Sequence, residues 1–127
     1  MGIWIANSTN IKLDNNVLYW AKKFLVYAEF VNNYTVTNNV FIGAKRRPEV
    51  AGVTTNTVMV DDVACYEQFQ PIDFATDNVT VTKNLCQGSD TGEGFVFPFA
   101  PCDKLDTYNF GGNTAGSCTV AFMFHKL

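Results

Sequence analysis

Residues 34–43, Tyr-Thr-Val-Thr-Asn-Asn-Val-Phe-Ile-Gly, contain the pattern that decides the fold. Large apolar side chains alternate with threonine over residues 34–37, two asparagines follow, and a second apolar run begins at Val40. Alternation with a period of two indicates a strand with one dry face, and asparagine tolerates the left-handed backbone of tight turns. The stretch therefore predicts two antiparallel strands joined by a hairpin turn at Asn38-Asn39.

Similar short runs lie along the rest of the chain. Threonine and valine alternate over residues 53–60 and 78–82, aromatic residues fill 95–99, and an apolar run closes the chain at 118–125. Asparagine, glycine and proline separate these runs at fairly regular intervals, and no internal repeat or domain linker is evident. We therefore expect residues 1–127 to form a single β-rich domain, an antiparallel β-sandwich or a jelly-roll-like fold.

Two segments are less certain within this all-β prediction. Residues 17–31 place several apolar side chains on one helical face, yet the same stretch is rich in aromatic and β-branched residues and is bracketed by pairs of asparagines. Strand is favoured there, with at most one helix at about 15–31 as the alternative. Residues 1–10 are apolar at first and then polar, which predicts a brief strand or an N-terminal arm.

Composition excludes several classes of protein. The 127 residues are 47% hydrophobic and only 17% charged, so the chain is too apolar for a disordered protein. A net charge of -3 argues against nucleic acid as a partner, because such binding needs many cations to neutralise phosphates. Residues 1–10 lack the basic start and apolar run of a signal peptide, and no stretch is long and apolar enough to predict a membrane span.

Four cysteines, Cys65, Cys86, Cys102 and Cys118, lack the paired spacing of a structural zinc site. Two disulfides are possible among them, with three connectivities open. Free cysteines packed in the core are the alternative, because cysteine is among the most buried residue types. The sequence leaves the choice open, since the redox compartment decides it.

The chain is poor in residues that could perform catalysis. Asp90-Thr91-Gly92 resembles the tripeptide around the catalytic carboxylate of aspartic proteases, but its glycine- and serine-rich flanks predict a flexible turn. Asp90 and Glu93 are weak candidates for binding calcium through oxygen ligands. His125 is the only histidine and lies near the C-terminal end of the sequence, where a catalytic base is poorly held. We expect no enzyme, no bound metal and no cofactor.

Aromatic residues are the remaining signal, because two tryptophans, five tyrosines and eleven phenylalanines are more than a thin fold can hide. Large aromatic side chains anchor protein contacts. A basic run at residues 45–47 predicts an exposed loop that could meet an acidic protein surface. The expected interface residues are Trp4, Ile5, Trp20, Phe97, Phe99, Tyr108, Arg46 and Arg47.

These features together predict a non-enzymatic structural or assembly subunit. The expected examples are a virion decoration protein, a minor capsid protein or another component of a fibre or surface assembly, bound to other protein subunits and most simply as a homo-oligomer. The expected location is a virion or an extracellular surface. The alternative is a secreted, lectin-like module that binds carbohydrate or protein, with Trp20 or Tyr108 as a platform for sugar rings.

Overall fold

The computed structural model describes residues 2–45, 63–70, 78–89, 92–98 and 107–124, and every strand pair within them is parallel. A seven-stranded sheet A and a four-stranded sheet B contain all of the described strands. The strands are β1 (Ile3–Asp14), β2 (Val17–Tyr19), β3 (Phe24–Thr37), β4 (Val40–Ile42), β5 (Ala64–Phe69), β6 (Val79–Thr82), β7 (Leu85–Gln87), β8 (Glu93–Phe97), β9 (Tyr108–Asn109), β10 (Thr114–Gly116) and β11 (Val120–Phe124).

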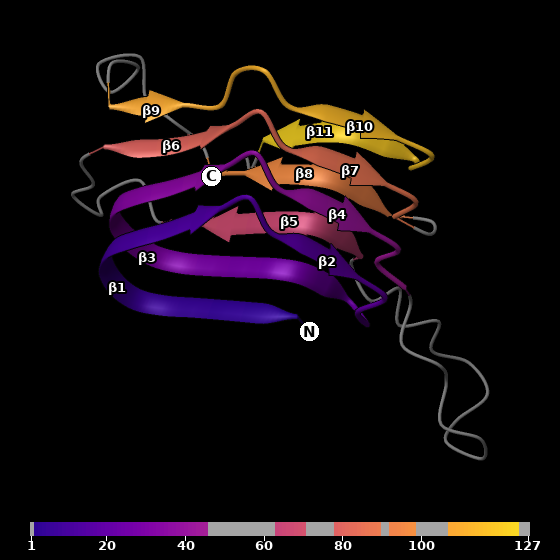
Figure 1. Ribbon diagram of the computed structural model, residues 1–127, viewed down its shortest axis with the longest axis horizontal. Helices are drawn as coiled ribbons and strands as arrows, with labels where there is room; N and C mark the ends of the chain where they lie inside the picture. The colour runs from indigo at the N-terminus through magenta and orange to yellow at the C-terminus, as the bar shows by residue number, and fades with distance from the viewer. Residues whose placement is uncertain (1, 46–62, 71–77, 90–91, 99–106, 125–127) are drawn as a thin grey trace.

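Strands that follow one another along the chain do not pair with one another. Ile3 in β1 lies beside Val26 in β3, and Val17 in β2 lies beside Val40 in β4, in both cases 23 residues further on. The chain therefore coils, and each turn lays its strands on those of the turn before (Figure 1). This arrangement is a parallel β-solenoid, in which each coil buries its apolar face against its neighbours.

Sheet A bends into a half-barrel because its two longest strands each turn a corner. The first part of β3 pairs with β5, and its last part pairs with β6. Sheet B, in the order β10-β7-β4-β2, closes the open side of each coil (Figure 1). The two sheets thus enclose one elongated core.

The prediction of an antiparallel sandwich or jelly roll is wrong, although the all-β class is confirmed. Thr35 in β3 pairs in parallel with Thr80 in β6, and Phe41 in β4 pairs in parallel with Cys86 in β7. Asn38-Asn39 therefore carries the chain from sheet A to sheet B and does not reverse it within one sheet. Alternation and a turn signal specify where strands begin and end, but the same local pattern serves a hairpin and a solenoid corner.

The two uncertain segments are also strands. The run from 17 to 31 forms β2 and the first half of β3, separated by a break at residues 20–23, so no helix forms at 15–31. The residues expected as a brief strand or arm at 1–10 belong to β1 from Ile3 onward and pair with β3.

Left-handed residues at the corners explain why the chain is rich in asparagine. Asn15, Asn38, Lys83 and Gly112 occupy equivalent corners in four successive coils and have φ angles of 59°, 56°, 57° and 72°. Asparagine and glycine adopt this region more readily than other residues. Three of these four corners thus use asparagine or glycine, which are typical of turns, and Lys83 occupies the remaining one.

A repeat of 23 residues underlies the first two coils, contrary to the expectation of none. The pattern Asn-x4-Asn-Asn-Val-x3-Ala-Lys runs from Asn10 to Lys22 and recurs from Asn33 to Lys45. The later coils do not keep this spacing. Leu85 lies 45 residues after its partner Val40, and Thr114 lies 29 residues after its partner Leu85. Unequal insertions therefore conceal the repeat from a search for a fixed period.

The core is aromatic, and its rings contact one another along the solenoid. Tyr66 packs against Phe95 and Phe97 at centroid distances of 6.2 and 6.0 Å, and Phe41 from sheet B meets Phe95 edge to face at 6.4 Å. A disulfide between Cys65 in β5 and Cys86 in β7 joins sheet A to sheet B through this core. Both packing and a covalent link therefore hold the two sheets together.

A ladder of asparagine side chains runs along the corner between the end of sheet A and sheet B. Asn16 Nδ2 donates to Asn39 Oδ1 at 3.1 Å, and Asn39 Nδ2 donates to Asn84 Oδ1 at 2.9 Å. Asn84 Nδ2 continues the ladder by donating to Asn113 Oδ1 at 3.0 Å. Asn39 and Asn84 are buried, so these bonds satisfy polar groups that water does not reach.

A second buried polar chain lies in the core at Tyr34 and Tyr66. The Tyr66 hydroxyl lies 3.0 Å from the Tyr34 hydroxyl and 2.7 Å from Gln68 Oε1, and Gln68 Nε2 donates to Gln70 Oε1. Burial raises the pKa of both tyrosines above the ordinary value of 10.0, and the neighbouring Tyr34 raises that of Tyr66 further. Both phenols therefore stay protonated in the folded protein where an unfolded chain would ionise.

We expect stability to fall as the pH rises above 10, because the unfolded state then releases protons that the folded state keeps. Below pH 10 the free energy of unfolding keeps its full value. Above pH 10 the two tyrosines lower it by up to about 2.7 kcal/mol per pH unit. Denaturant unfolding between pH 8 and 12 measures the slope. Tyr34→Phe should make it shallower, and a slope unchanged by that substitution would contradict the assignment.

Candidate binding surface

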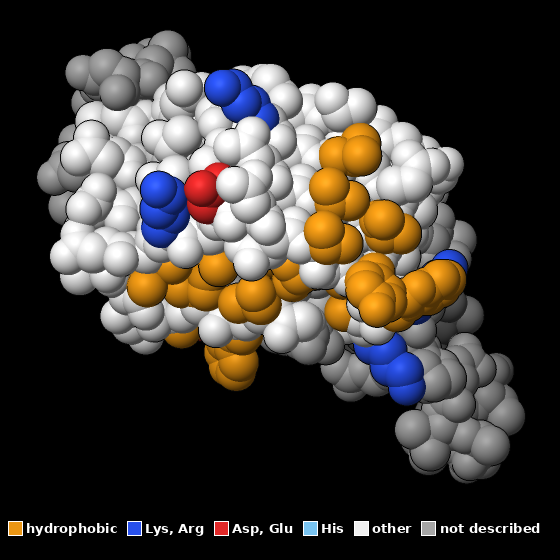
Figure 2. Space-filling model, viewed as in Figure 1, with side chains coloured by type: hydrophobic (Ala, Val, Ile, Leu, Met, Phe, Trp, Pro, Cys, Tyr) orange, Lys and Arg blue, Asp and Glu red, His pale blue; other side chains and the backbone are white. Residues whose placement is uncertain are grey.

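The outer face of sheet B is apolar and exposed. Val17, Val40 and Leu85 lie side by side on successive strands, and Tyr19 lies beside Ile42. Val17 and Tyr19 are each 64% exposed, whereas Ile42 and Leu85 are 37% and 39% exposed. Figure 2 shows these hydrophobic side chains gathered over sheet B. The four strands of this sheet carry no charged residue. We call this surface the sheet B face.

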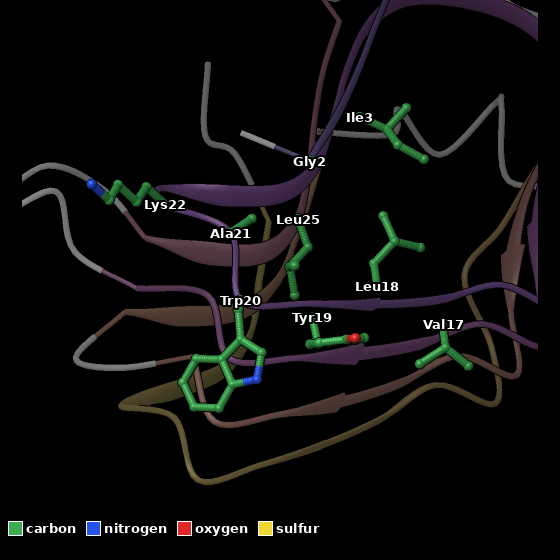
Figure 3. Close-up of a pocket in the computed structure, with 9 residues that line it drawn as sticks. All are labelled: Gly2, Ile3, Val17, Leu18, Tyr19, Trp20, Ala21, Lys22 and Leu25. Carbon is green, nitrogen blue, oxygen red and sulfur yellow. The ribbon is translucent and has the colours of Figure 1, made fainter.

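The first coil ends in an open pocket of about 610 Å³ between the beginnings of β1 and β3 and the edge strand β2. Ile3, Leu18 and Leu25 point toward one another in this space (Figure 3). Val17, Tyr19 and Trp20 also line the pocket, although their side chains lie on the opposite side of β2 from Leu18 (Figure 3). In the second coil the equivalent inward residue, Phe41, lies beside Leu18 and is fully buried, so the pocket is an uncovered end of the core among the residues that the structure describes.

Trp20 stands at the border between the sheet B face and the pocket. Its ring lies over Gly43, where an added Cβ would come within 3.3 Å of the indole Cε3. Trp20 follows Tyr19 in the first coil, and Gly43 follows the paired Ile42 in the second coil. Gly43 has a φ of 78° and no side chain, so it leaves room for the Trp20 indole. Trp20 is still 66% exposed, so most of its surface is available to a partner.

Three lysines cluster at the same corner. Lys22 forms a parallel bridge with Lys45, and Lys23 lies next to Lys22 in the chain. The Lys45 Nζ is 5.2 Å from the Trp20 ring centroid, and the Lys23 Nζ is 5.3 Å from that of Phe24. Residues 15–28 and 38–45 contain no aspartate or glutamate. These two stretches of the described chain therefore carry only positive charge, although the whole chain is acidic.

The expected interface residues are dispersed by the fold. Trp4 and Trp20 are exposed, but Ile5 and Phe97 are core residues at 8% and 1% exposure, and Tyr108 is half-buried against the core. Phe99, Arg46 and Arg47 lie outside the described residues. Sequence reasoning missed the exposed residues of sheet B, which are Val17, Tyr19, Ile42 and Leu85. The 23-residue repeat could have found the first of them, since it aligns Val17 with Val40 on one face.

Most of the residues considered for catalysis or metal binding lie outside the part of the chain that the structure describes. Glu93 lies in β8, whereas Asp90, Cys102 and His125 lie outside the described part of the chain. Within that part, no three His, Cys, Asp or Glu side chains gather to hold a metal ion. Cys118 is a free thiol, and burial raises its pKa, which keeps it protonated and weakens it as a nucleophile.

No helix among the described residues has the length and apolar character needed to cross a bilayer. Comparisons of the chain with known protein families, with curated proteins and with solved structures find no match.

Proposed function

We propose that the chain is a non-catalytic assembly subunit that associates with further copies of itself through the sheet B face. The observation that supports this function is the set of exposed side chains on that face, in which Val17, Tyr19, Ile42 and Leu85 are adjacent to one another. Contiguous exposed apolar surface on a folded protein marks an interaction site. Burying a large apolar side chain fully contributes about 1.5–3 kcal/mol, so several together can drive association.

The chemistry of the face suits contact with an identical surface. Its strands have no charged residue, so two copies related by a twofold axis meet without like-charge repulsion. Edge strands and exposed faces that avoid association usually carry charges, which this sheet does not. A parallel solenoid also presents an extended and regular surface, as structural components require.

The proposed setting is a virion or another extracellular surface assembly. The Cys65–Cys86 disulfide supports an oxidising environment of this kind, because disulfides persist outside the reducing cytosol. The hydrogen bonds of the asparagine ladder hold the corner rigidly, which supports a scaffold function.

Replacing Ile42 and Leu85 together by serine should weaken self-association at least about tenfold, because it removes apolar area from the centre of the face. Sedimentation velocity over a range of protein concentrations measures the effect. Trp4→Ser with Met123→Ser is the matched control, since both residues are exposed apolar positions of sheet A. A wild-type chain that remains monomeric at high concentration, or equal effects of the two double variants, would contradict the proposal.

A second candidate function is carbohydrate binding, and the exposed rings of Tyr19 and Trp20 favour it. These neighbouring rings are 64% and 66% exposed, and exposed aromatic rings can stack on the apolar faces of sugars. A glycan-binding screen with wild type and Trp20→Ala separates this function from self-association. Loss of a glycan signal in Trp20→Ala, with self-association unchanged, would favour the lectin-like alternative.

A further inference from the structure

We infer that the open end of the first coil is a docking site for an extended, apolar and acidic segment of a partner protein, which adds to β2 as a parallel strand. The inference rests on the edge of β2, on the pocket beside it and on the lysines at its end, and it does not depend on the proposed self-association. Both sites include β2, but the docked segment would pair with the backbone edge of this strand, whereas self-association would use the outward side chains of β2, β4 and β7.

Strand β2 offers backbone groups that pair with nothing in the described structure. It is the last strand of sheet B and has β4 on one side only. The Asn16 carbonyl accepts from Val40 N, and Trp20 N donates to Ile42 O, both at 2.9 Å, so alternate residues face β4. By the alternation of a parallel ladder, the backbone groups of Val17 and Tyr19 face the free edge. A bound strand would satisfy them by strand addition.

The pocket would receive an apolar side chain from that strand. Phe41 in β4 points into the core at the position next to Leu18 and is fully buried. An added strand in the same register would place one side chain on the other side of Leu18, between Ile3 and Leu25. The volume of about 610 Å³ is ample for a side chain as large as phenylalanine. The mainly apolar lining favours a protein segment over a sugar, because a sugar needs several polar groups to fix its hydroxyls.

The lysines define the charge of the partner. Lys22 follows Leu18 by four residues along the chain. It pairs with Lys45, which follows β4. A strand continuing in register would bring its own residue beside Lys22, where an aspartate or glutamate would be attracted by Lys22, Lys23 and Lys45. A lysine at that position would be repelled. The recognised segment is therefore an apolar residue followed four places later by an acidic one.

The chain itself supplies a suitable probe. Residues 38–45 already pair with β2 from its other side, so a synthetic peptide repeating residues 38–45 with Lys45→Glu has the required backbone, apolar side chain and acidic residue. The same peptide with its native lysine is the matched control. Binding would be measured by NMR titration of the Ile42→Ser/Leu85→Ser chain, so that its result is independent of self-association.

We expect the acidic peptide to bind about tenfold more tightly than the lysine peptide and to shift the amide resonances of Val17 and Tyr19 first. The variant Lys22→Glu/Lys45→Glu should reverse the preference, while its circular dichroism spectrum stays that of the parent chain. Equal affinity of the two peptides, no reversal in that variant, shifts elsewhere on the surface, or binding only of an acidic oligosaccharide would each overturn the inference.

Discussion

Asn84→Ala should lower the free energy of unfolding by about 4 kcal/mol, the largest effect we expect from a single substitution. Asn84 Oδ1 accepts from the backbone N–H and the side-chain amide of Asn39, and its Nδ2 donates to the Val36 carbonyl and to Asn113. Alanine would leave the buried Asn39 backbone N–H without this partner and remove the side-chain bonds to Asn39 Nδ2 and the Val36 carbonyl, at about 1–3 kcal/mol for a buried group left unsatisfied and about 1 kcal/mol for each further bond. Urea unfolding followed by circular dichroism measures the change.

Asn16→Ala is the matched control because it removes the same side chain at the end of the ladder. Asn16 is only half-buried, and water can reach the groups that its side chain leaves. We expect it to cost about 1 kcal/mol. Similar losses in the two variants would show that the buried ladder does not stabilise the corner in the way that its hydrogen bonds indicate.

Removing the disulfide by Cys65→Ala/Cys86→Ala should destabilise the protein by about 3 kcal/mol, according to the chain-entropy estimate for a loop of this length. The bond joins residues 21 positions apart and links β5 of sheet A to β7 of sheet B. Without the bond, the unfolded chain has more conformational entropy, which lowers the free energy of unfolding. Urea unfolding of the double variant and of wild type, each with and without reductant, measures this contribution.

Cys118→Ala is the control for that experiment. Its thiol is free and half-buried, so its loss should change the unfolding free energy little in either condition. Reductant should destabilise wild type and leave the double variant unchanged. If reductant has no effect on wild type, Cys65 and Cys86 do not form the bond in solution.

The sequence was sufficient to predict strands but not how they pair. The alternation at residues 34–37 and 79–82 gave strands at the right positions, because side-chain period is a local property. The direction of pairing depends on contacts between Thr35 and Thr80, 45 residues apart, and no local pattern encodes them. Asn38-Asn39 suits a hairpin turn and a solenoid corner equally, so the wrong topology followed from a correctly placed turn.

The candidate surface was predicted only in part for the same reason. Trp20 was expected at an interface because large aromatic side chains anchor protein contacts, and its ring is exposed. Ile42 and Leu85 are ordinary strand residues in sequence, and they form a surface only when the coil brings β4 and β7 together. Phe97 was expected at an interface but is enclosed between neighbouring coils, where it stacks on Phe110 at 4.3 Å.

The coil itself underlies the sheet B face, the open end of the first coil and the asparagine ladder, and one NMR measurement tests it directly. Nuclear Overhauser contacts between backbone protons should connect residues 34–37 with residues 79–82 in parallel order, and residues 17–19 with residues 40–42. Contacts that instead connect residues 34–37 with residues 40–43 in reverse order would show a hairpin and contradict the solenoid.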